Sequence, residues 1–349
     1  IIDFAKEAFG FLPGGLGFVV VGASMLFGGI SGSAIADSAA IGSVMIPNMA
    51  KQGYSKAFAG GLVAAAGTIG IIIPPSIPML IYGFVGNVSV ADLFLAGVVP
   101  GLIFGLLFMA VCYYIGKKTN CDPGGQRTSA KALWRSFVRS APALFMPVLI
   151  LGGIFGGLVT PTEAAAVAVV YGFFVTVVLY RDFSIKEMPK LIIDSFITSA
   201  IVMVVIGATT VLGWLITLEQ LPQMLAQFIN SVSESPFTFL LLVNVVLLML
   251  GLVLDPLPAI LLTAPLFIPT AMNFGVDPVH LGVIMTCNVA VGLFTPPVGA
   301  TLYVASRISG VGVLSIARAM APLYLAAISA LLLVTYVPAI SMTMVELFR

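Results

Sequence analysis

The sequence predicts an all-α polytopic membrane protein built from two inverted repeats. The first observation is composition, because 60% of the 349 residues are hydrophobic and only 8% are charged, whereas soluble domains carry roughly 25% charged residues. The second is that long apolar stretches recur along the chain without the alternation of a membrane β-barrel. The third is a pattern of Asp, Gly and Pro that occurs twice. Together they exclude most soluble enzymes, nucleic-acid-binding proteins and disordered chains.

The predicted helices and half-helices follow the apolar segments, since an α-helix rises 1.5 Å per residue and about 20 residues span a bilayer. These segments are 11–30, 34–50, 56–86, 93–116, 141–158, 162–180, 192–216, 237–254, 258–272, 279–306 and 320–340. Residues 1–10 have the pattern of the end of an amphipathic helix. Because the chain also starts at Ile1 rather than Met, we expect further N-terminal sequence to precede it.

Charged residues in the loops predict which side of the membrane each loop faces. Residues 117–139 contain many lysines and arginines, Arg127 among them, whereas 217–236 carry only Glu219 and Glu234. An excess of Lys and Arg marks the cytoplasmic side. The loops predicted to be cytoplasmic are 51–56, 117–139, 181–190 and 307–319, and those predicted to lie outside are 87–92, 217–236 and 273–280.

An internal repeat links the two halves of the chain. The first copy contains Asp37, Pro47, Gly53, Gly70, Pro74-Pro75 and Tyr82, and the second contains Asp255, Pro265, Gly275, Gly292, Pro296-Pro297 and Tyr303. The Asp-to-Pro spacing is 10 residues in both copies, and the spacing from the first Gly to the proline pair is 21. The loop at Gly53 is predicted inside and the loop at Gly275 outside, so the copies are inverted. Inverted repeats are typical of secondary transporters.

Each repeat is predicted to contain a re-entrant hairpin followed by a broken helix. Residues 11–50 leave and return to the cytoplasmic side, which requires a turn within FGGISGS, and 237–272 turn near GLVLDPLPA. Two consecutive prolines then interrupt TIGIIIPPS and VGLFTPPVG, because they remove N–H donors and clash with the preceding turn. Carbonyls freed in this way suit a hard cation such as Na⁺, and the following half-helix N-terminus suits a carboxylate. The alternative is that the prolines only kink packed helices.

Other chemistry-bearing residues are few. Asp37 and Asp255 either take part in ion coupling or gating, or only complement the start of a helix, with Asp255-Pro256 as N-cap and first helical residue. Thr160-Pro161-Thr162-Glu163 matches a capping box, so Glu163 is predicted to be structural. His280 is predicted to lie on the outer surface. The three cysteines lack ligand spacing, so no transition-metal site is predicted.

Two functions of other classes compete with a transporter. A membrane-embedded enzyme would need a catalytic pair, and Asp37 with Asp255 is the candidate. An ion channel would conduct without any delivery protein, and an ion-coupled carrier could also work without one. Inverted hairpins argue against the channel.

The strings ISGSAIADSAAIGSVMIPNMAKQGY, TIGIIIPPSIPMLIYG, GGLVTPTEAAAVAVVYG and GLFTPPVGATLYVAS resemble the large membrane subunit of tripartite ATP-independent periplasmic (TRAP) transporters, lacking the N-terminal helices usual in that family. The resemblance covers essentially the whole chain. It implies a sodium-coupled importer of the elevator type in the bacterial inner membrane. It also implies a small four-helix membrane subunit, separate or fused, and a periplasmic substrate-binding protein. The implied substrates are C4-dicarboxylates, sialic acid or other sugar acids, and no nucleic acid is involved.

The resemblance also implies site residues. The first sodium site would use Ser31, Gly70, Ile73 and Pro74, and the second Gly251, Gly292, Thr295 and Val298. Separately from the resemblance, we hypothesise a substrate site bounded by Ser31, Ser33, Ser76 and Thr301, together with Pro75 and Pro297. The tip FGGISGS departs from the family pattern, with Gly28 or Gly29 in place of a serine, so the carbonyls are the firmer part of the first site.

The predicted organisation has four parts. Residues 1–86 and 237–306 are the two repeats and form a transport domain. Residues 87–236 supply scaffold helices, at 93–116 and 192–216, and the basic linker 117–139. Residues 307–349 contain a C-terminal membrane helix. The hypothesis is that sodium closes the backbone around the substrate before the transport domain moves.

Overall fold

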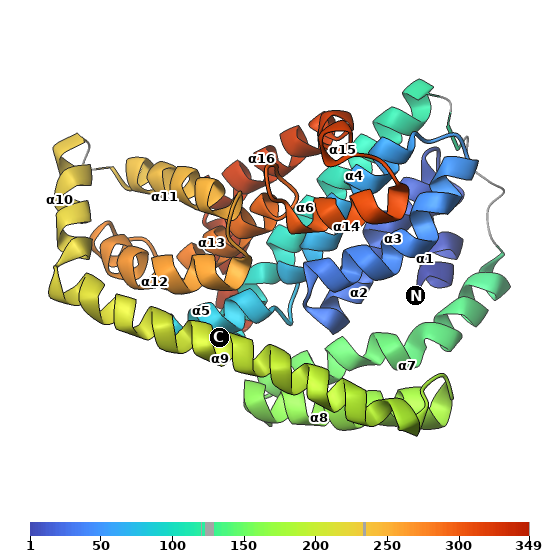
Figure 1. The fold of residues 1–349 in the computed structure, drawn as a ribbon, viewed down its shortest axis with the longest axis horizontal. Coiled ribbons are helices and arrows are strands. Elements are labelled where there is room, and N and C mark those ends of the chain that lie inside the picture. Colours follow the sequence, from blue (N-terminus) through green and yellow to red (C-terminus); the bar gives the residue numbers. More distant parts are fainter. Residues whose placement is uncertain (120, 123–128, 233–234, 349) are drawn as a thin grey trace.

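The computed structural model describes residues 1–119, 121–122, 129–232 and 235–348, and every regular element within these ranges is a helix (Figure 1). In this described part, five helices are long and apolar enough to cross a membrane, or seven if each of two bent pairs is one span. The prediction of an all-α multi-pass membrane protein is confirmed. Arg127 and Glu234, which entered the prediction of loop orientation, lie outside the described residues.

The first repeat folds as a helical hairpin followed by a broken helix. Gly32 joins the hairpin helices with φ +59°, a left-handed conformation that glycine adopts without strain. Ser33 then caps the second hairpin helix by accepting from the Ala36 N–H. The elements are α2 (Gly15–Ser31), α3 (Ala34–Lys51), α4 (Lys56–Gly67), η1 (Thr68–Ile71) and α5 (Ile77–Gly86). The helix breaks between η1 and α5, where the proline pair predicts it. That the hairpin ends within the bilayer stays a prediction.

The second repeat has the same order of parts. Its hairpin turns between Gly251 and Pro256, and its broken helix is interrupted between Gly292 and Ala300. The elements are α11 (Pro236–Gly251), α12 (Pro256–Asn273), α13 (Pro278–Gly292) and α14 (Ala300–Ser309). The two repeats interlock, because α14 packs on α3 and α4 while α12 and α13 pack on α5.

The long helix α6 (Val90–Thr119) lies among the two repeats. It packs against α2, α13, α16 (Ala321–Tyr336) and α17 (Ala339–Phe348), and half of its most apolar window is buried. The sequence predicts residues 93–116 to be scaffold together with 192–216. Because α6 packs against helices of both repeats, its place in the scaffold stays a prediction.

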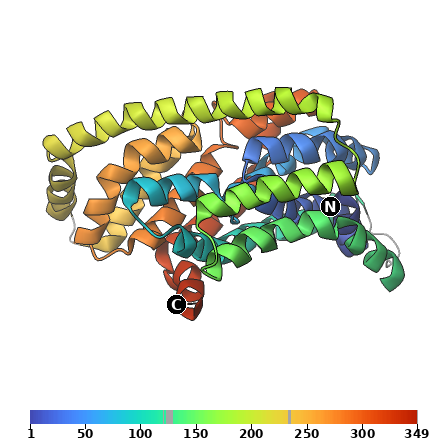
Figure 2. The same cartoon turned by 90° about the horizontal axis from the view of Figure 1, so that it is seen from below.

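Three helices form a layer outside this body. They are α7 (Ala130–Phe155), α8 (Pro161–Phe174), which continues through η2 (Val175–Leu179), and α9 (Met188–Leu218), which follows η3 (Ile185–Glu187). They lie along the lower edge in Figure 1, and Figure 2 shows α9 running the length of one face. Only 17%, 11% and 6% of their most apolar windows are buried. Such apolar surface requires lipid or another membrane chain around it.

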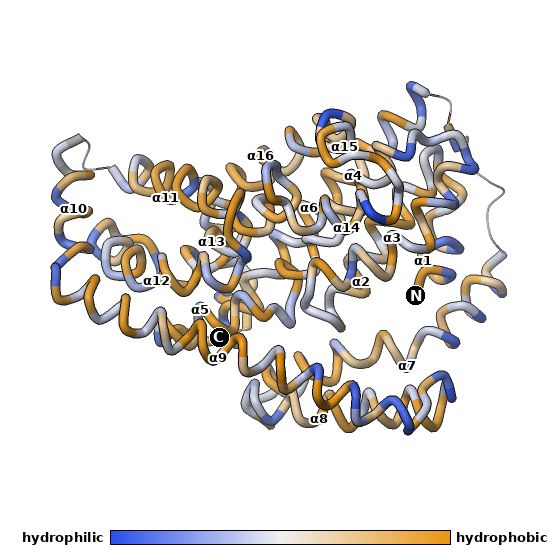
Figure 3. Tube along the Cα trace, in the orientation of Figure 1, coloured by the Kyte–Doolittle hydropathy of each residue, from blue (hydrophilic) through white to orange (hydrophobic). Residues whose placement is uncertain are grey.

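Some elements follow from tertiary packing and were not predicted. The amphipathic α10 (Leu221–Val232) packs against α12, and α15 (Val313–Ala319) follows α14 after a bend of 103°. The predicted helix at 320–340 ends at Tyr336, and α17 continues at an angle of 55°. The short α1 (Ile2–Phe9), by contrast, falls in the stretch 1–10 predicted to be helical, and it lies against α2 and α7. Figure 3 shows hydrophilic residues gathered near the ends of the long helices, as loops at a membrane surface require.

The prediction that His280 lies on the outer surface is wrong. The side chain is 2% exposed. Its Nδ1 lies 2.6 Å from the Ser341 hydroxyl and its Nε2 lies 3.2 Å from the Thr335 carbonyl oxygen. The bend between α16 and α17 covers the start of α13, and a contact across 61 residues has no signature in the local sequence.

A buried polar network continues from this point between α11, α13 and α16. The Asn244 amide donates to the Thr335 hydroxyl at 3.1 Å, and the Asn288 amide donates to the Asn244 carbonyl oxygen at 2.7 Å. All three side chains are buried. Paired buried amides are costly to separate, so the network holds the outer hairpin arm α11 on α13.

Candidate functional site

The first hairpin meets the first broken helix through two glycines. A Cβ added to Gly70 would lie 2.9 Å from the Gly28 Cα, closer than real Cβ atoms come to backbone. Both glycines are buried. The close approach brings the end of α2 against η1, where the helix is about to break. Only glycine permits this crossing, so these two positions set where the hairpin tip lies.

Asp37 faces the same crossing. The Ser31 hydroxyl donates to Asp37 Oδ1, and the Ser33 N–H donates to the Ser31 oxygen at 3.1 Å. Asp37 is fully buried, and its Oδ2 has no hydrogen-bond partner. That oxygen lies 3.3 Å from where a Cβ on Gly28 would be. An unpartnered buried carboxylate oxygen is costly unless a cation or a proton joins it.

The carbonyl oxygens of the first proline pair lie close to the hairpin tip. The Pro74 oxygen lies 3.7 Å from the Cβ position of Gly29, and the Pro75 oxygen lies 3.1 Å from that of Gly32. Carbonyl, hydroxyl and carboxylate oxygens are therefore all found near one end of the hairpin. This donor set fits a hard cation such as Na⁺.

The second hairpin meets the second break in the same way. A Cβ on Gly292 would lie 2.6 Å from the Gly251 Cα. The Val298 N–H donates to the Leu252 carbonyl at 3.3 Å, so the tip and the break are also joined by a hydrogen bond. The two repeats thus share a Gly–Gly crossing between hairpin and broken helix, which is the geometry that the matched spacing of Gly70 and Gly292 reflects.

The two aspartates differ in environment although their sequence positions match. Asp37 is buried and bonded to Ser31, whereas Asp255 is exposed. Asp255 occupies the N-cap position of α12 with Pro256 at its first turn, as predicted, but its side chain makes no capping hydrogen bond. The repeat therefore preserves the backbone crossing and not the carboxylate.

The structure brings part of the predicted set together. At the first tip it gathers Ser31, Gly70 and Pro74, and at the second Gly251, Gly292 and Val298. Ile73 points elsewhere, since its side chain packs against Gly101 of α6. The side chain of Ile73 therefore says nothing about its carbonyl, and the role of that carbonyl in sodium binding stays a prediction.

The predicted substrate residues fall into two groups. Some are at least partly exposed, and the others are buried with their hydroxyls already hydrogen-bonded. Ser31, Ser33 and Pro75 are partly exposed and Pro297 is exposed. Ser76 and Thr301 are buried instead, and their hydroxyls donate to the Ile71 and Leu293 carbonyls at 2.5 and 2.9 Å. In this conformation both hydroxyls satisfy carbonyls freed by the breaks, and a contact of theirs with substrate stays a prediction.

Sequence reasoning missed Tyr324 on α16. Its hydroxyl donates to the Phe294 carbonyl at 2.9 Å, and the two rings stack with centroids 5.7 Å apart. A carbonyl freed by the second break is thereby satisfied from another helix. Nothing in the local sequence around Tyr324 signals this contact.

The predicted capping box is confirmed, because Thr160 and Glu163 each accept from the other's backbone N–H, at 3.3 and 2.8 Å.

Comparison with known proteins decides the family. The family model described as "Tripartite ATP-independent periplasmic transporter, DctM component" matches residues 1–340. The chain belongs to this family. It is a multi-pass TRAP permease, and the family and its relatives are named as transporter permeases, not as enzymes.

Curated relatives agree along nearly the full chain. The C4-dicarboxylate TRAP transporter large permease protein DctM of Pseudomonas aeruginosa is 43% identical over 99% of this chain and 80% of its own length. The sialic acid TRAP transporter large permease protein SiaM of Vibrio cholerae is 40% identical over 100% of this chain and 81% of its own. The isethionate TRAP transporter permease protein DctMQ of Oleidesulfovibrio alaskensis is 40% identical over 98% of this chain and 54% of its own.

Proposed function

We propose that this TRAP permease imports a carboxylate-bearing organic acid across the bacterial inner membrane, coupled to sodium. The observation that carries the proposal is the pair of Gly–Gly crossings, each of which brings a hairpin against a broken helix, with the Pro74 and Pro75 carbonyls near the tip at the first crossing. At the first crossing the unpartnered Asp37 oxygen supports a coupling cation. The relatives named for C4-dicarboxylates and sialic acid support an organic acid as substrate.

We further propose an elevator movement with two partners. The hairpins and broken helices move as the transport domain against a scaffold that includes α7, α8 and α9. The exposed apolar surface of these three helices supports a small four-helix membrane subunit, separate or fused, and lipid as their neighbours. A periplasmic binding protein delivers the substrate, as the family description implies.

Uptake of labelled organic acids into vesicles tests the proposal. The full-length chain is reconstituted with its small subunit, and its binding protein is added outside. We expect accumulation that requires both the binding protein and an inward sodium gradient. Accumulation without sodium coupling refutes the proposal, and currents that continue without the binding protein indicate a channel instead.

Thr295→Ala tests the second sodium site. The Thr295 hydroxyl donates to the Val291 carbonyl at 2.7 Å, which leaves its oxygen lone pairs for a cation. We expect the sodium concentration for half-maximal uptake to rise about fivefold, the size of one lost oxygen ligand. Thr286→Ala is the matched control, because Thr286 makes the same bond to Gly282 at 2.8 Å away from the break. An unchanged sodium requirement counts against Thr295 as a ligand.

A further inference from the structure

Each hairpin meets the outer layer of α7, α8 and α9 at a glycine that packs against a proline ring. At the first contact, a Cβ on Gly29 of α2 would lie 3.3 Å from Cγ of Pro147 on α7. At the second, a Cβ on Gly213 of α9 would lie 3.6 Å from Cγ of Pro265 on α12. The hairpin supplies the glycine in one contact and the proline in the other. Glycine lets two membrane helices approach closely, so both hairpins lie directly on the layer at these points.

Neither contact offers a hydrogen bond between side chains. Glycine has no side chain, and the proline ring has no N–H. Within the part of the chain that the structure describes, no hydrogen bond joins α7, α8 or α9 to a helix of either repeat. Thr270 of α12 donates to the Pro222 carbonyl at 3.3 Å, but Pro222 belongs to α10, beyond the end of α9. The two contacts can therefore separate without leaving a buried polar group unpaired.

Contacts within each group of helices are polar by comparison. In the outer layer, the Tyr171 hydroxyl donates to the Pro142 carbonyl at 2.8 Å and joins α8 to α7. In the body, the Tyr324 hydroxyl donates to the Phe294 carbonyl at 2.9 Å. Breaking such bonds costs more than parting two apolar surfaces of similar size. The boundary that separates most easily therefore runs through the glycine–proline contacts.

The two repeats differ in how they meet the layer. Pro265 and Pro47 occupy matched positions, each ten residues after an aspartate. Pro265 is partly buried against α9, whereas Pro47 on α3 is exposed. Inverted repeats exchange roles when a transporter alternates between the two sides of a membrane. A body at one end of its movement is therefore expected to dock one of these hairpin arms and to leave its counterpart free.

We propose that the Gly29–Pro147 and Gly213–Pro265 contacts dock the transport domain on the outer layer in this conformation, and that both break together when the domain moves. This inference rests on the elevator movement of the proposed function. The two repeats interlock, because α14 packs on α3 and α4 while α12 and α13 pack on α5. One hairpin therefore cannot leave the layer while the other stays in place.

A disulfide across the second contact tests whether it breaks during transport. In a chain without the three native cysteines, Gly213→Cys with Pro265→Cys places two Cβ atoms 3.8 Å apart, within the range of about 3.5–4.5 Å that suits a disulfide. We expect oxidation to stop uptake and reduction to restore it, whereas chains with either cysteine alone do not respond to the oxidant. A pair that forms no disulfide, or a disulfide that leaves uptake unchanged, overturns the proposal.

A bulky residue at the second contact tests whether the two contacts break together. The reporter is the rate of disulfide formation in Gly29→Cys with Pro147→Cys, whose Cβ atoms would lie 3.6 Å apart. We expect Gly213→Leu to lower this rate about fivefold or more, because overpacking against Pro265 disfavours the docked conformation. Gly213→Ala should keep the rate within about twofold, since a Cβ fits there at an ordinary van der Waals distance.

Gly207→Leu is the matched control on the same helix, because nothing lies within 4 Å of its Cβ position. It should leave the reporter rate unchanged. A rate that Gly213→Leu does not alter, or that Gly207→Leu lowers equally, overturns the proposal.

Uptake kinetics separate docking from binding. Gly213 belongs to neither proposed sodium site and not to the proposed substrate site. We expect Gly213→Leu to lower the maximal rate of uptake about fivefold, and to keep the KM for the acid and the sodium requirement within about twofold. A raised KM with an unchanged maximal rate overturns the docking role. The disulfide rates need neither sodium nor substrate, so they judge the contacts even where a wild type without sodium-driven uptake refutes the proposed function.

Discussion

At the scale of single residues, the candidate site depends on glycines, which have no Cβ, as much as on polar side chains. Gly28 and Gly70 allow two backbones to cross, and Gly251 and Gly292 do the same in the second repeat. At the first crossing, Asp37 adds a carboxylate whose second oxygen is buried without a partner. The residues proposed to bind sodium through backbone carbonyls are marked in the sequence mainly by Gly and Pro, whereas the carboxylate of Asp37 can be recognised directly.

Gly292→Ala tests the second crossing. The new Cβ would lie 2.6 Å from the Gly251 Cα and 2.7 Å from its carbonyl oxygen, and neither backbone atom can turn aside. We expect the hairpin tip to be displaced, with uptake falling about tenfold or more and a lower Tm in detergent. Gly152→Ala is the control, since nothing lies within 4 Å of its Cβ position. Wild-type uptake by Gly292→Ala contradicts a tight crossing.

Asp37→Asn and Asp255→Asn form a matched pair across the repeat. Asp37 is buried at the first crossing and Asp255 is exposed, so only the first is placed to meet a cation. We expect Asp37→Asn to reduce sodium-driven uptake at least about tenfold, because an amide replaces a charged oxygen ligand. Asp255→Asn should stay within about twofold of wild type. Equal losses would support the symmetric role that the sequence left open.

At the scale of elements, local chemistry decides where each helix begins and ends. The proline pairs stop η1 and α13, and Ser33, Ser55, Ser129 and Thr160 cap the helices that follow them. The two breaks and the Thr160 cap are predicted from neighbouring residues. Ser129 starts α7 at Ala130, whereas the predicted apolar segment begins at 141, because the cap precedes a polar first part of the helix. The bend between α16 and α17 and the amphipathic α10 could not be predicted, because packing against distant helices determines them.

The buried network between α11, α13 and α16 gives an element-scale prediction. Asn244→Ala removes the partner of both Asn288 and Thr335, which then lie buried without it. We expect a loss of about 1–3 kcal/mol in stability, read as a lower Tm in detergent. Asn48→Ala, at an exposed position of α3, should change stability by about 0.5 kcal/mol or less. A Tm unchanged by Asn244→Ala would mean that the network does not hold α11 on α13.

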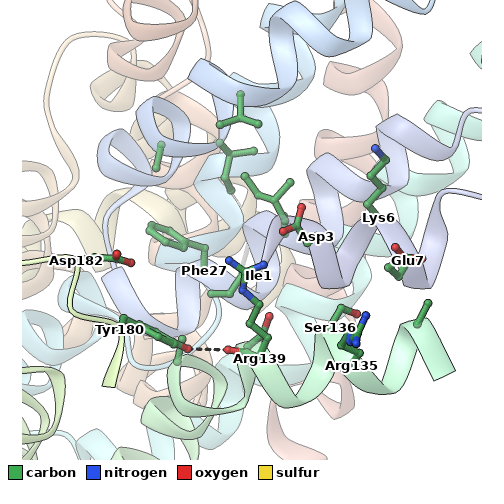
Figure 4. A pocket seen from close by; sticks show the side chains of 18 of the residues that line it. Ile1, Asp3, Lys6, Glu7, Phe27, Arg135, Ser136, Arg139, Tyr180 and Asp182 are labelled. Carbon is green, nitrogen blue, oxygen red and sulfur yellow. Dashed lines mark hydrogen bonds between the residues drawn. The ribbon is translucent and has the colours of Figure 1, made fainter. Parts of the chain in front are cut away.

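At the scale of the whole molecule, the helices divide into a packed body and an exposed layer. The repeats interlock around α6, while α7, α8 and α9 expose most of their apolar surface. A cavity of about 1080 Å³ lies where α7 faces the body (Figure 4). An elevator needs such a boundary, because one group of helices slides past another.

Linking the two walls of the cavity tests the movement. Val44 on α3 and Ala143 on α7 both line it. In a chain without Cys112, Cys121 and Cys287, we expect a bifunctional reagent that joins cysteines at these two positions to stop uptake, since it ties the hairpin to the outer layer. A pair at Phe145 and Tyr171, whose rings lie 5.9 Å apart within that layer, should be linked without loss. Continued uptake through the Val44–Ala143 link would contradict the elevator.

The sequence by itself determined the class, most of the helical segments, the two hairpins and the two breaks. Hydropathy and the conformational limits of Gly and Pro act over a few residues, so they can be read locally. Only the tertiary structure decided which oxygens are engaged and which face a site. It buries Asp37 but exposes Asp255, covers His280, uses Ser76 and Thr301 inside the breaks, and opens a cavity beside α7. Each of these depends on contacts between segments far apart in the chain, and no local pattern specifies them.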